Sequence, residues 1–195
     1  MSIAEQKKAM RTEMKLALAR LGPMEIAARS AAACGFLVDR FGAAKTVMAY
    51  LAMPVEADPA GAMAVWRARG ARVCAPRSDW ESRTMEPAVL GGKLIEGAKG
   101  IREPGPSQPV VETGELEVVV VPGLGFTATG DRLGRGAGFY DRFLARLGTE
   151  TVTVGLAVSV QIVDDLPTEP TDRRVDMVVT EDGLVSCRAG DSEGV

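Results

Sequence analysis

The amino-acid sequence predicts an α/β fold with a layered, mostly parallel central sheet flanked by helices. Segments 46–53 and 71–76 are short apolar runs of the kind found in buried strands, and segment 59–70 between them has helical character. A strand, a helix and a second strand in succession are typical of a parallel sheet covered by helices. Four consecutive valines at 118–121 belong at the centre of such a sheet, because a strand there is apolar on both faces.

Two helices are expected before the first strand. The first spans residues 3–21, where no proline or glycine occurs until Gly22 and Pro23 end it, and the second spans 24–41. Lys7 interrupts the apolar seam of the first helix at positions 3, 7, 10, 14, 17 and 21. The pattern alone favours a lysine whose stem lies along the helix surface while its amine reaches solvent.

The rest of the chain supplies the remaining layers. Residues 77–115 are rich in glycine, proline and charge, and we expect one or two short strands and a long loop there. Segment 116–126 contains the strongest strand, the four valines bounded by Pro122 and Gly123, and a helix from near Gly138 and a strand over 151–158 are expected after it. A final strand with a hairpin turn at Asp182 and Gly183 is expected within 175–187. The prediction is therefore one domain over 1–187 with a disordered tail over 188–195.

Composition restricts the class of protein. The chain has 195 residues and a net charge of -3, so no overall positive field favours nucleic acid. The first ten residues contain no apolar run of signal-peptide length, and no stretch reaches the length of a membrane span. Three widely separated cysteines favour buried free thiols in a reducing compartment. We therefore expect a cytoplasmic protein that binds neither nucleic acid nor membrane.

The chain contains no histidine. Serine–histidine–aspartate catalysis, cysteine–histidine catalysis and histidine metal sites are therefore excluded. Any chemistry must rely on carboxylates, lysine, arginine, tyrosine, backbone amides or a metal held by carboxylates.

The segment GDRLGRGAGFYDRFL (130–144) is the strongest chemical motif. Glycines at 134, 136 and 138 alternate with other residues, cations stand at 132, 135 and 142, and the segment follows the central strand and opens a helix. In open parallel sheets ligands bind beyond the carboxyl ends of the strands, and a helix N-terminus there favours phosphate. The spacing matches neither a Walker A loop nor the dinucleotide fingerprint. A phosphate-binding loop is therefore expected, with a purely structural glycine turn as the alternative.

Asp141 directly follows this loop. In the first turn of a helix an aspartate commonly serves as a cap or interacts with the dipole. Beside a phosphate it becomes a candidate Mg²⁺ ligand, because Mg²⁺ is held by one or two carboxylates together with phosphate oxygens. Asp172 or Asp176 could supply the second carboxylate, although Asp176 could simply end the preceding turn.

The motifs together resemble the 5-formyltetrahydrofolate cyclo-ligase family, also called 5,10-methenyltetrahydrofolate synthetases. The resemblance covers Lys7 to Gly183 and rests on these segments: KKAMR (7–11), YLAMPVEAD (50–58), RVCAPR (72–77), GIREP (100–104), VVVVPGLGFTATGDRLGRGAGFYDRFLARL (118–147), LPTEPTDRRVD (166–176) and VVTEDG (178–183). It implies a fold similar to the NagB/RpiA/CoA-transferase group. It also implies ATP- and Mg²⁺-dependent conversion of 5-formyltetrahydrofolate to 5,10-methenyltetrahydrofolate, by a chain expected to be a monomer.

The resemblance implies a role for each matching residue. The N-terminal cations become ATP contacts, which reverses the interpretation of Lys7. The implied ATP-binding residues are Lys7, Lys8, Arg11, Arg132, Leu133, Gly134, Arg135, Gly136, Ala137, Gly138, Phe139 and Tyr140. The implied substrate-binding residues are Leu51, Glu56, Arg135, Gly136, Ala137, Gly138 and Phe139. Asp141 and Asp172 are the implied magnesium ligands, and Arg132, Arg135 and Asp141 are the implied catalytic residues.

Two alternatives to this function remain at the sequence level. One is a paralogue that keeps the ATP loop but acts on another substrate, and the other is a non-catalytic folate- or nucleotide-binding module. Thr171 stands where many family members have histidine, and segment 91–115 is either a lid over the site or inert surface.

Overall fold

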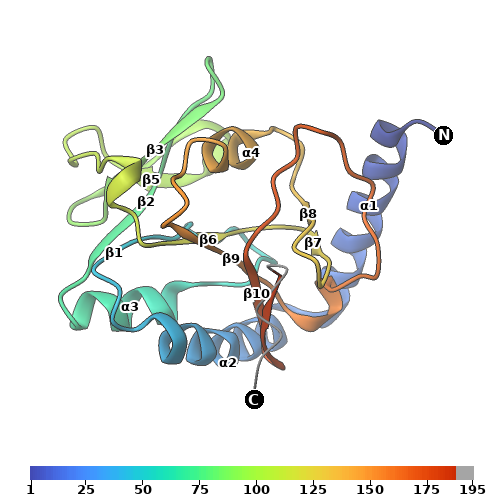
Figure 1. Cartoon of the computed structure of the whole chain (residues 1–195), viewed down its shortest axis with the longest axis horizontal. Coiled ribbons are helices and arrows are strands. Elements are labelled where there is room, and N and C mark those ends of the chain that lie inside the picture. Colours follow the sequence, from blue (N-terminus) through green and yellow to red (C-terminus); the bar gives the residue numbers. More distant parts are fainter. Residues whose placement is uncertain (188–195) are drawn as a thin grey trace.

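A seven-stranded sheet forms the centre of the protein, in a computed structural model that describes residues 1–187 (Figure 1). Its strands lie in the order β11, β10, β9, β6, β1, β2, β3. Their bounds are β1 (Thr46–Met48), β2 (Arg72–Asp79), β3 (Thr84–Val89), β6 (Val118–Val121), β9 (Val152–Leu156), β10 (Met177–Thr180) and β11 (Gly183–Ser186). The five inner strands pair in parallel, and β3 and β11 are antiparallel edges. The predicted α/β fold with a mostly parallel sheet is confirmed.

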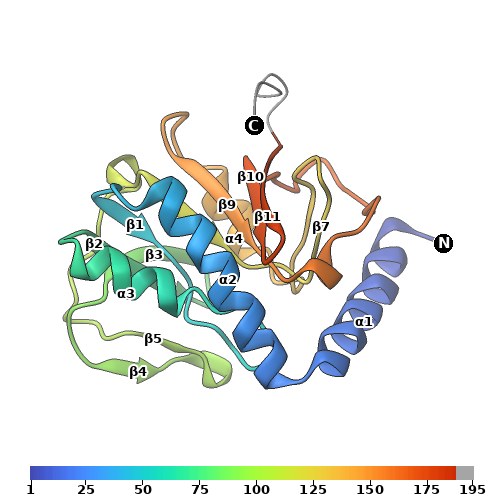
Figure 2. The same ribbon diagram turned by 90° about the horizontal axis from the view of Figure 1, so that it is seen from below.

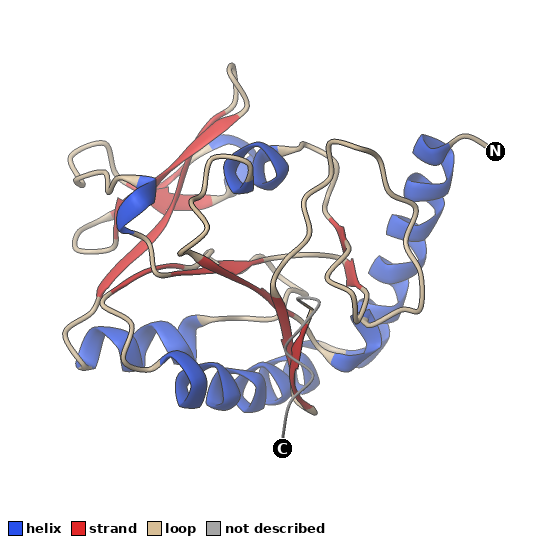
Figure 3. Ribbon diagram, viewed as in Figure 1, coloured by secondary structure: helices blue, strands red, loops and turns tan. Residues whose placement is uncertain are grey.

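Helices and two small hairpins surround the sheet (Figure 3). The helices are α1 (Ile3–Leu21), α2 (Pro23–Phe41), α3 (Ala60–Ala68) and α4 (Phe139–Leu144). The hairpins pair β4 (Leu94–Glu96) with β5 (Arg102–Pro104), and β7 (Gly125–Phe126) with β8 (Arg132–Leu133). Short 3₁₀ turns cover Ala98–Gly100, Thr113–Glu115 and Ser159–Gln161.

The valine strand β6 lies fourth of seven and is buried on both faces, as its composition predicts. Val118 and Val120 belong to the core beneath α2 and α3, whereas Val119 and Val121 belong to the core beneath α4. Figure 1 shows α2 and α3 on one side of the sheet and α4 on the other, and Figure 2 views the molecule from the side of α2 and α3. Successive side chains of a strand point to opposite faces, so a run of valines fills both cores.

Helix α1 lies beside the β7–β8 hairpin and the loop that leads to β10 (Figure 1). Ser2 and Glu5 form a capping box at its start, which satisfies two amides that the helix leaves free. Gly22, with φ of 77°, ends α1, and Pro23 begins α2. The predicted bounds of both helices agree with the structure to within one residue.

Several predicted strands are longer than the observed ones. The run 46–53 supplies only β1, since residues 49–59 leave the sheet as a loop. In segment 116–126 the strand β6 is the four valines and ends before Pro122, as predicted, because Pro122 has no amide with which to continue the ladder; Gly125–Phe126 form the separate strand β7. Segment 77–115 holds more strand than expected: the end of β2, then β3, β4 and β5. The hairpin turn at Asp182 and Gly183 is confirmed, and the predicted tail over 188–195 lies outside the described residues.

Two of the three cysteines are buried free thiols, as predicted: Cys34 and Cys74, while Cys187 is half-buried. Burial raises the pKa of the Cys74 thiol to about 11. Within residues 1–187 no helix combines the length and apolar character that crossing a membrane requires.

The first testable prediction concerns Phe126, which is fully buried against Gly155 of β9. A Cβ atom at position 155 would lie 2.5 Å from the Phe126 ring. We expect Gly155→Ala to lower the free energy of unfolding by about 1–3 kcal/mol, because the methyl group overpacks the core. Gly148→Ala is the matched control, since its Cβ would meet nothing within 4 Å. Urea unfolding measures both, and equal midpoints for wild type and Gly155→Ala would contradict the prediction.

Candidate active site

The predicted functional residues gather at the edge of the sheet where the parallel strands end. Residues 49–59 follow β1, the glycine loop 134–138 follows β6 through the β7–β8 hairpin, and residues 166–176 lead from β9 to β10. Helix α1 lies beside this edge of the sheet (Figure 1). The site therefore lies where open parallel sheets bind ligands.

The three glycines of the loop make room for three guanidinium groups. A Cβ atom on any of them would approach an arginine side chain, and the nearest guanidinium atoms are Nη1 of Arg132 at 2.8 Å from position 134, Cζ of Arg11 at 3.4 Å from position 136 and Nη1 of Arg142 at 3.1 Å from position 138. Gly136 and Gly138 also have φ values of 102° and 72°, which side chains rarely allow. The alternation of glycine with other residues thus concentrates positive charge around the loop.

The sequence also predicted that a helix N-terminus would contribute to anion binding. Helix α4 is only six residues long, so its dipole adds little. Gly138 is its N-cap and Arg142 donates to the carbonyl of Ala137 at 2.8 Å. The groups available to bind an anion at this loop are therefore the arginine side chains and the loop amides.

Arg132 and Asp141 form an ion pair at the centre of the site. Arg132 is 8% exposed, and its Nη2 lies 2.8 Å from Oδ1 of Asp141. The same Asp141 oxygen accepts the backbone N–H of Arg173 at 3.3 Å, which brings Asp141 beside Asp172. The Nε of Arg132 and the hydroxyl of Tyr140 are buried, with no hydrogen-bond partner in the described part of the chain. Burial raises the pKa of Tyr140, so its hydroxyl stays protonated.

Lys7 is buried and paired, so the snorkelling interpretation from the helix pattern is wrong. It is 6% exposed, and its Nζ lies 2.6 Å from Oδ2 of Asp172 and 2.7 Å from Oε2 of Glu169. Burial lowers the pKa of Lys7, but the hydrogen bonds and charges of the two carboxylates outweigh it and raise the pKa above its ordinary value. The amine is therefore charged at neutral pH.

Glu56 and Arg135 form a third ion pair. Glu56 is nearly buried; its Oε1 lies 2.7 Å from Nε of Arg135, and its Oε2 accepts the N–H of Met53 at 2.9 Å. Val55 has a φ of 62°, a strained conformation for a β-branched residue. The tight turn over 53–56 thus fixes the Glu56 carboxylate toward the glycine loop.

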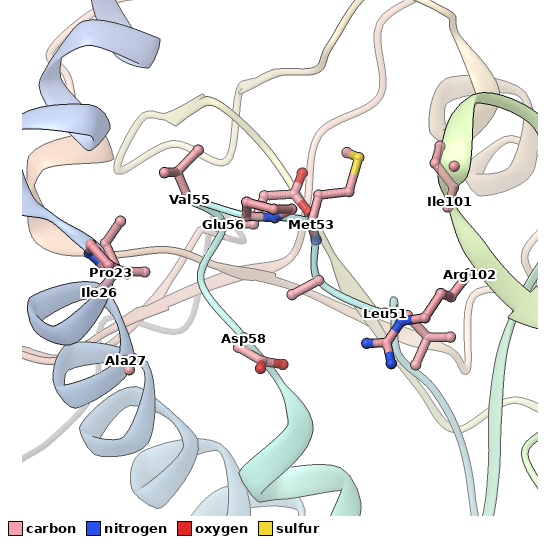
Figure 4. A pocket seen from close by; sticks show the side chains of 13 residues that line it. Pro23, Ile26, Ala27, Leu51, Met53, Val55, Glu56, Asp58, Ile101 and Arg102 are labelled. Atoms are coloured by element: carbon pink, nitrogen blue, oxygen red, sulfur yellow. The ribbon is translucent and has the colours of Figure 1, made fainter. Parts of the chain in front are cut away.

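A pocket of about 480 Å³ opens beside Glu56 (Figure 4). Leu51 and Glu56, the predicted substrate contacts, both line it. The rest of its wall is largely apolar and includes Ile26, Met53 and Ile101. Ile101 and its neighbour Arg102 belong to segment 91–115, so part of this segment borders the pocket.

The remaining predicted residues occupy different environments. The Nε of Arg11 donates to the carbonyl of Gly134 at 2.9 Å, and Lys8 is exposed on α1. Leu133 is buried in the core, so only its backbone can contact a ligand. The ring of Phe139 packs edge-on against Trp80, with centroids 4.9 Å apart.

Sequence reasoning missed Glu169 as a partner of Lys7. The available signal was an acid three residues before Asp172, in the same proline-bounded loop. Asp176, the alternative second carboxylate, instead accepts hydrogen bonds from Thr153 at the start of β9. Asp172 is therefore the acid that lies at the site.

The carboxylates fit a Mg²⁺ ion only with further ligands. Within residues 1–187 no three acidic, cysteine or histidine side chains are grouped to hold a metal. Asp141 engages donors through Oδ1, and no donor to its Oδ2 is found among the described residues. Asp141 and Asp172 therefore suit a cation that takes its other ligands from phosphate oxygens and water.

These features define an α/β protein with a glycine-rich, cation-lined loop and compensating carboxylates at the carboxyl edge of a parallel sheet. The chain belongs to the 5-formyltetrahydrofolate cyclo-ligase family, whose pattern matches residues 3–181. The predicted family, and with it the predicted class of enzyme, a ligase, are confirmed.

Individual relatives agree with this assignment. The 5-formyltetrahydrofolate cyclo-ligase of Mycolicibacterium smegmatis is 34% identical over 74% of this chain and 78% of its own length. The mouse protein of the same name is 33% identical over 57% of this chain and 61% of its own length. The NMR structure of Aquifex aeolicus 5,10-methenyltetrahydrofolate synthetase superposes with a TM-score of 0.81 at 27% identity, covering 97% of this chain and 96% of that one.

The second testable prediction concerns Lys7. Lys7→Ala leaves Asp172 and Glu169 without their cation, so we expect the free energy of unfolding to fall by about 1–3 kcal/mol. Lys15→Ala, an exposed lysine on the same helix, is the control and should change it by less than about 0.5 kcal/mol. Because the pKa of Lys7 is raised in the folded protein, its contribution to stability depends on pH. The contribution is complete below about pH 10 and is lost as pH rises through the folded pKa of Lys7. Denaturant melts from pH 7 to 11 measure both effects, and a Lys7→Ala curve that matches wild type would contradict the assignment.

Proposed function

We propose that the protein catalyses the ATP- and Mg²⁺-dependent cyclisation of 5-formyltetrahydrofolate to 5,10-methenyltetrahydrofolate, with release of ADP and phosphate. One observation carries the proposal beyond family membership. Each acid that the family resemblance assigns to the site is paired with one of its assigned cations: Asp141 with Arg132, Asp172 with Lys7 and Glu56 with Arg135.

Two of these pairs, Asp141 with Arg132 and Asp172 with Lys7, can exchange partners when ligands bind. ATP phosphates offer anionic oxygens to the cations, and a Mg²⁺ ion offers positive charge to Asp141 and Asp172. The exchange leaves no buried charge unpaired, because each group trades one opposite charge for another. The same residues thus form a stable site without ligand and a complementary site for ATP and Mg²⁺.

The bound Mg²⁺ would neutralise charge on the phosphate oxygens and hold them in place. Asp141 and Asp172 are the residues that would hold it. Arg132 and the loop amides stabilise charge on the transferred phosphoryl group, and Arg11 supports the loop through the Gly134 carbonyl. Positioning and charge neutralisation dominate phosphoryl transfer, so a site without histidine is sufficient.

The proposed reaction has two chemical steps. First, the formyl oxygen of the folate attacks the γ-phosphorus, the bond from that phosphorus to the bridging oxygen breaks, and ADP leaves. Second, the folate N10 attacks the activated formyl carbon and loses its proton, while the carbon–oxygen bond breaks and inorganic phosphate leaves. Water must be kept from the activated carbon, and the apolar wall of the pocket serves this purpose.

Glu56 and Leu51 suit recognition of the pterin. A pterin presents N–H donors on one edge and flat apolar faces, and the pocket presents a fixed carboxylate beside an apolar wall. The pocket thus supports a folate substrate over an unrelated one.

The test is the ATP-dependent rise in methenyltetrahydrofolate absorbance when 5-formyltetrahydrofolate is added to the purified protein. We expect turnover that requires both ATP and Mg²⁺. Binding of folate and nucleotide without turnover would support the non-catalytic module. ATP hydrolysis that requires a different substrate and does not occur with 5-formyltetrahydrofolate would support the paralogue.

The third testable prediction distinguishes a specific role of the Asp141 carboxylate in catalysis from the general effect of removing a negative charge. Asp141→Asn removes a proposed Mg²⁺ ligand while nearly preserving side-chain volume, and we expect kcat to fall about 100-fold or more. Asp131→Asn is the matched control, because Asp131 also pairs with an arginine, the exposed Arg174, but lies outside the loop. Its turnover should stay within about two-fold of wild type. Mg²⁺ titrations of all three proteins give the result, and normal turnover of Asp141→Asn at limiting Mg²⁺ would remove Asp141 from the metal site.

A further inference from the structure

We propose that Arg102 determines specificity for the glutamate portion of the substrate by binding a carboxylate of that portion at the rim of the pocket. This inference rests on the proposed function and assigns a residue to the part of a reduced folate farthest from the chemistry. The pocket lining contains one cation among its described residues, and it is Arg102.

The β4–β5 hairpin fixes the direction of the Arg102 side chain. The next residue, Glu103, is nearly buried, and its Oε2 accepts the backbone N–H of Ser78 in β2 at 3.0 Å. Neighbouring residues of a strand point in opposite directions, so anchoring Glu103 against β2 turns Arg102 away from β2. Figure 4 shows the Arg102 guanidinium directed past Leu51 into the pocket.

The acidic residues near the pocket either interact with other groups or form no ion pair with Arg102. Glu56 is paired with Arg135, and Asp58 accepts the N–H of Ala60 at 2.9 Å. Glu96 stands opposite Arg102 in the antiparallel register, but no carboxylate of the described residues forms an ion pair with the guanidinium. Arg102 therefore offers an uncompensated planar donor group to a ligand in the pocket.

The substrate carries complementary chemistry at the required places. The pterin needs an acceptor, which Glu56 supplies. The aminobenzoyl ring needs an apolar wall, which Leu51, Met53 and Ile101 supply. The glutamate carries two carboxylates, and arginine binds carboxylates in a bidentate geometry. A folate with its pterin at Glu56 and its carboxylate at Arg102 would place a complementary group at each of these two residues of the wall.

The fourth testable prediction uses two substrates and two variants. The substrates are 5-formyltetrahydrofolate and 5-formyltetrahydropteroate, which lacks the glutamate. We expect Arg102→Gln to raise KM for the full substrate about ten-fold, with kcat nearly unchanged, and to leave KM for the truncated substrate nearly unchanged. Arg102→Lys should recover part of the loss, since it restores the charge without the planar group.

Arg67→Gln, an exposed arginine on α3, is the control and should leave both KM values unchanged. Equal KM increases for both substrates with Arg102→Gln would show a structural role and overturn the inference, as would no increase for either. Thermal melts of each variant confirm folding. If the wild-type protein converts neither substrate, the proposed function fails and the inference with it, whereas wild-type turnover with an equal loss overturns the inference alone.

Discussion

The site depends on one electrostatic constraint: a buried cation must have a counter-charge. Lys7 and Arg132 are 6% and 8% exposed, and a buried positive charge without a counter-charge would strongly destabilise the fold. Asp172, Glu169 and Asp141 supply the counter-charges. The elements that carry these residues are far apart in the chain, namely α1, the loop before β10 and the start of α4, so the ion pairs also hold α1 against the edge of the sheet. The groups proposed to bind ATP and Mg²⁺ are the same groups that stabilise this edge.

The glycine loop (134–138) meets a steric requirement for gathering positive charge at the site. Guanidinium groups can gather around a backbone only where no side chain of that backbone is in the way, and positions 134, 136 and 138 each leave that space. Gly136 and Gly138 add backbone conformations that other residues rarely adopt. The structural interpretation of the glycines and the ligand-binding interpretation are therefore compatible, because the turn creates the site. A turn that merely reversed the chain would not need an arginine against every glycine.

The sequence predicts much of the fold because the strongest patterns are local. The valine run 118–121, the uninterrupted helix 3–21 and the turn at Asp182 and Gly183 need no tertiary information. The residues of the site follow from the family resemblance, and the structure brings most of them together. Partnerships across the chain are harder to predict: Lys7 lies 162 residues from Glu169 in sequence, and helical periodicity favoured solvent for it. The direction of Arg102 likewise depends on how Glu103 contacts β2, which no local pattern encodes.

The central claim is that the ion pairs of the free protein are replaced by contacts to ATP and Mg²⁺. A structure determined with a non-hydrolysable ATP analogue and Mg²⁺ tests it most directly. The account predicts that Nζ of Lys7 moves from Asp172 to a phosphate oxygen. It also predicts that Asp141 and Asp172 both coordinate the metal and that Arg132 contacts the γ-phosphate. A complex in which the Lys7–Asp172 and Arg132–Asp141 pairs persist unchanged, with the phosphates bound elsewhere, would contradict it.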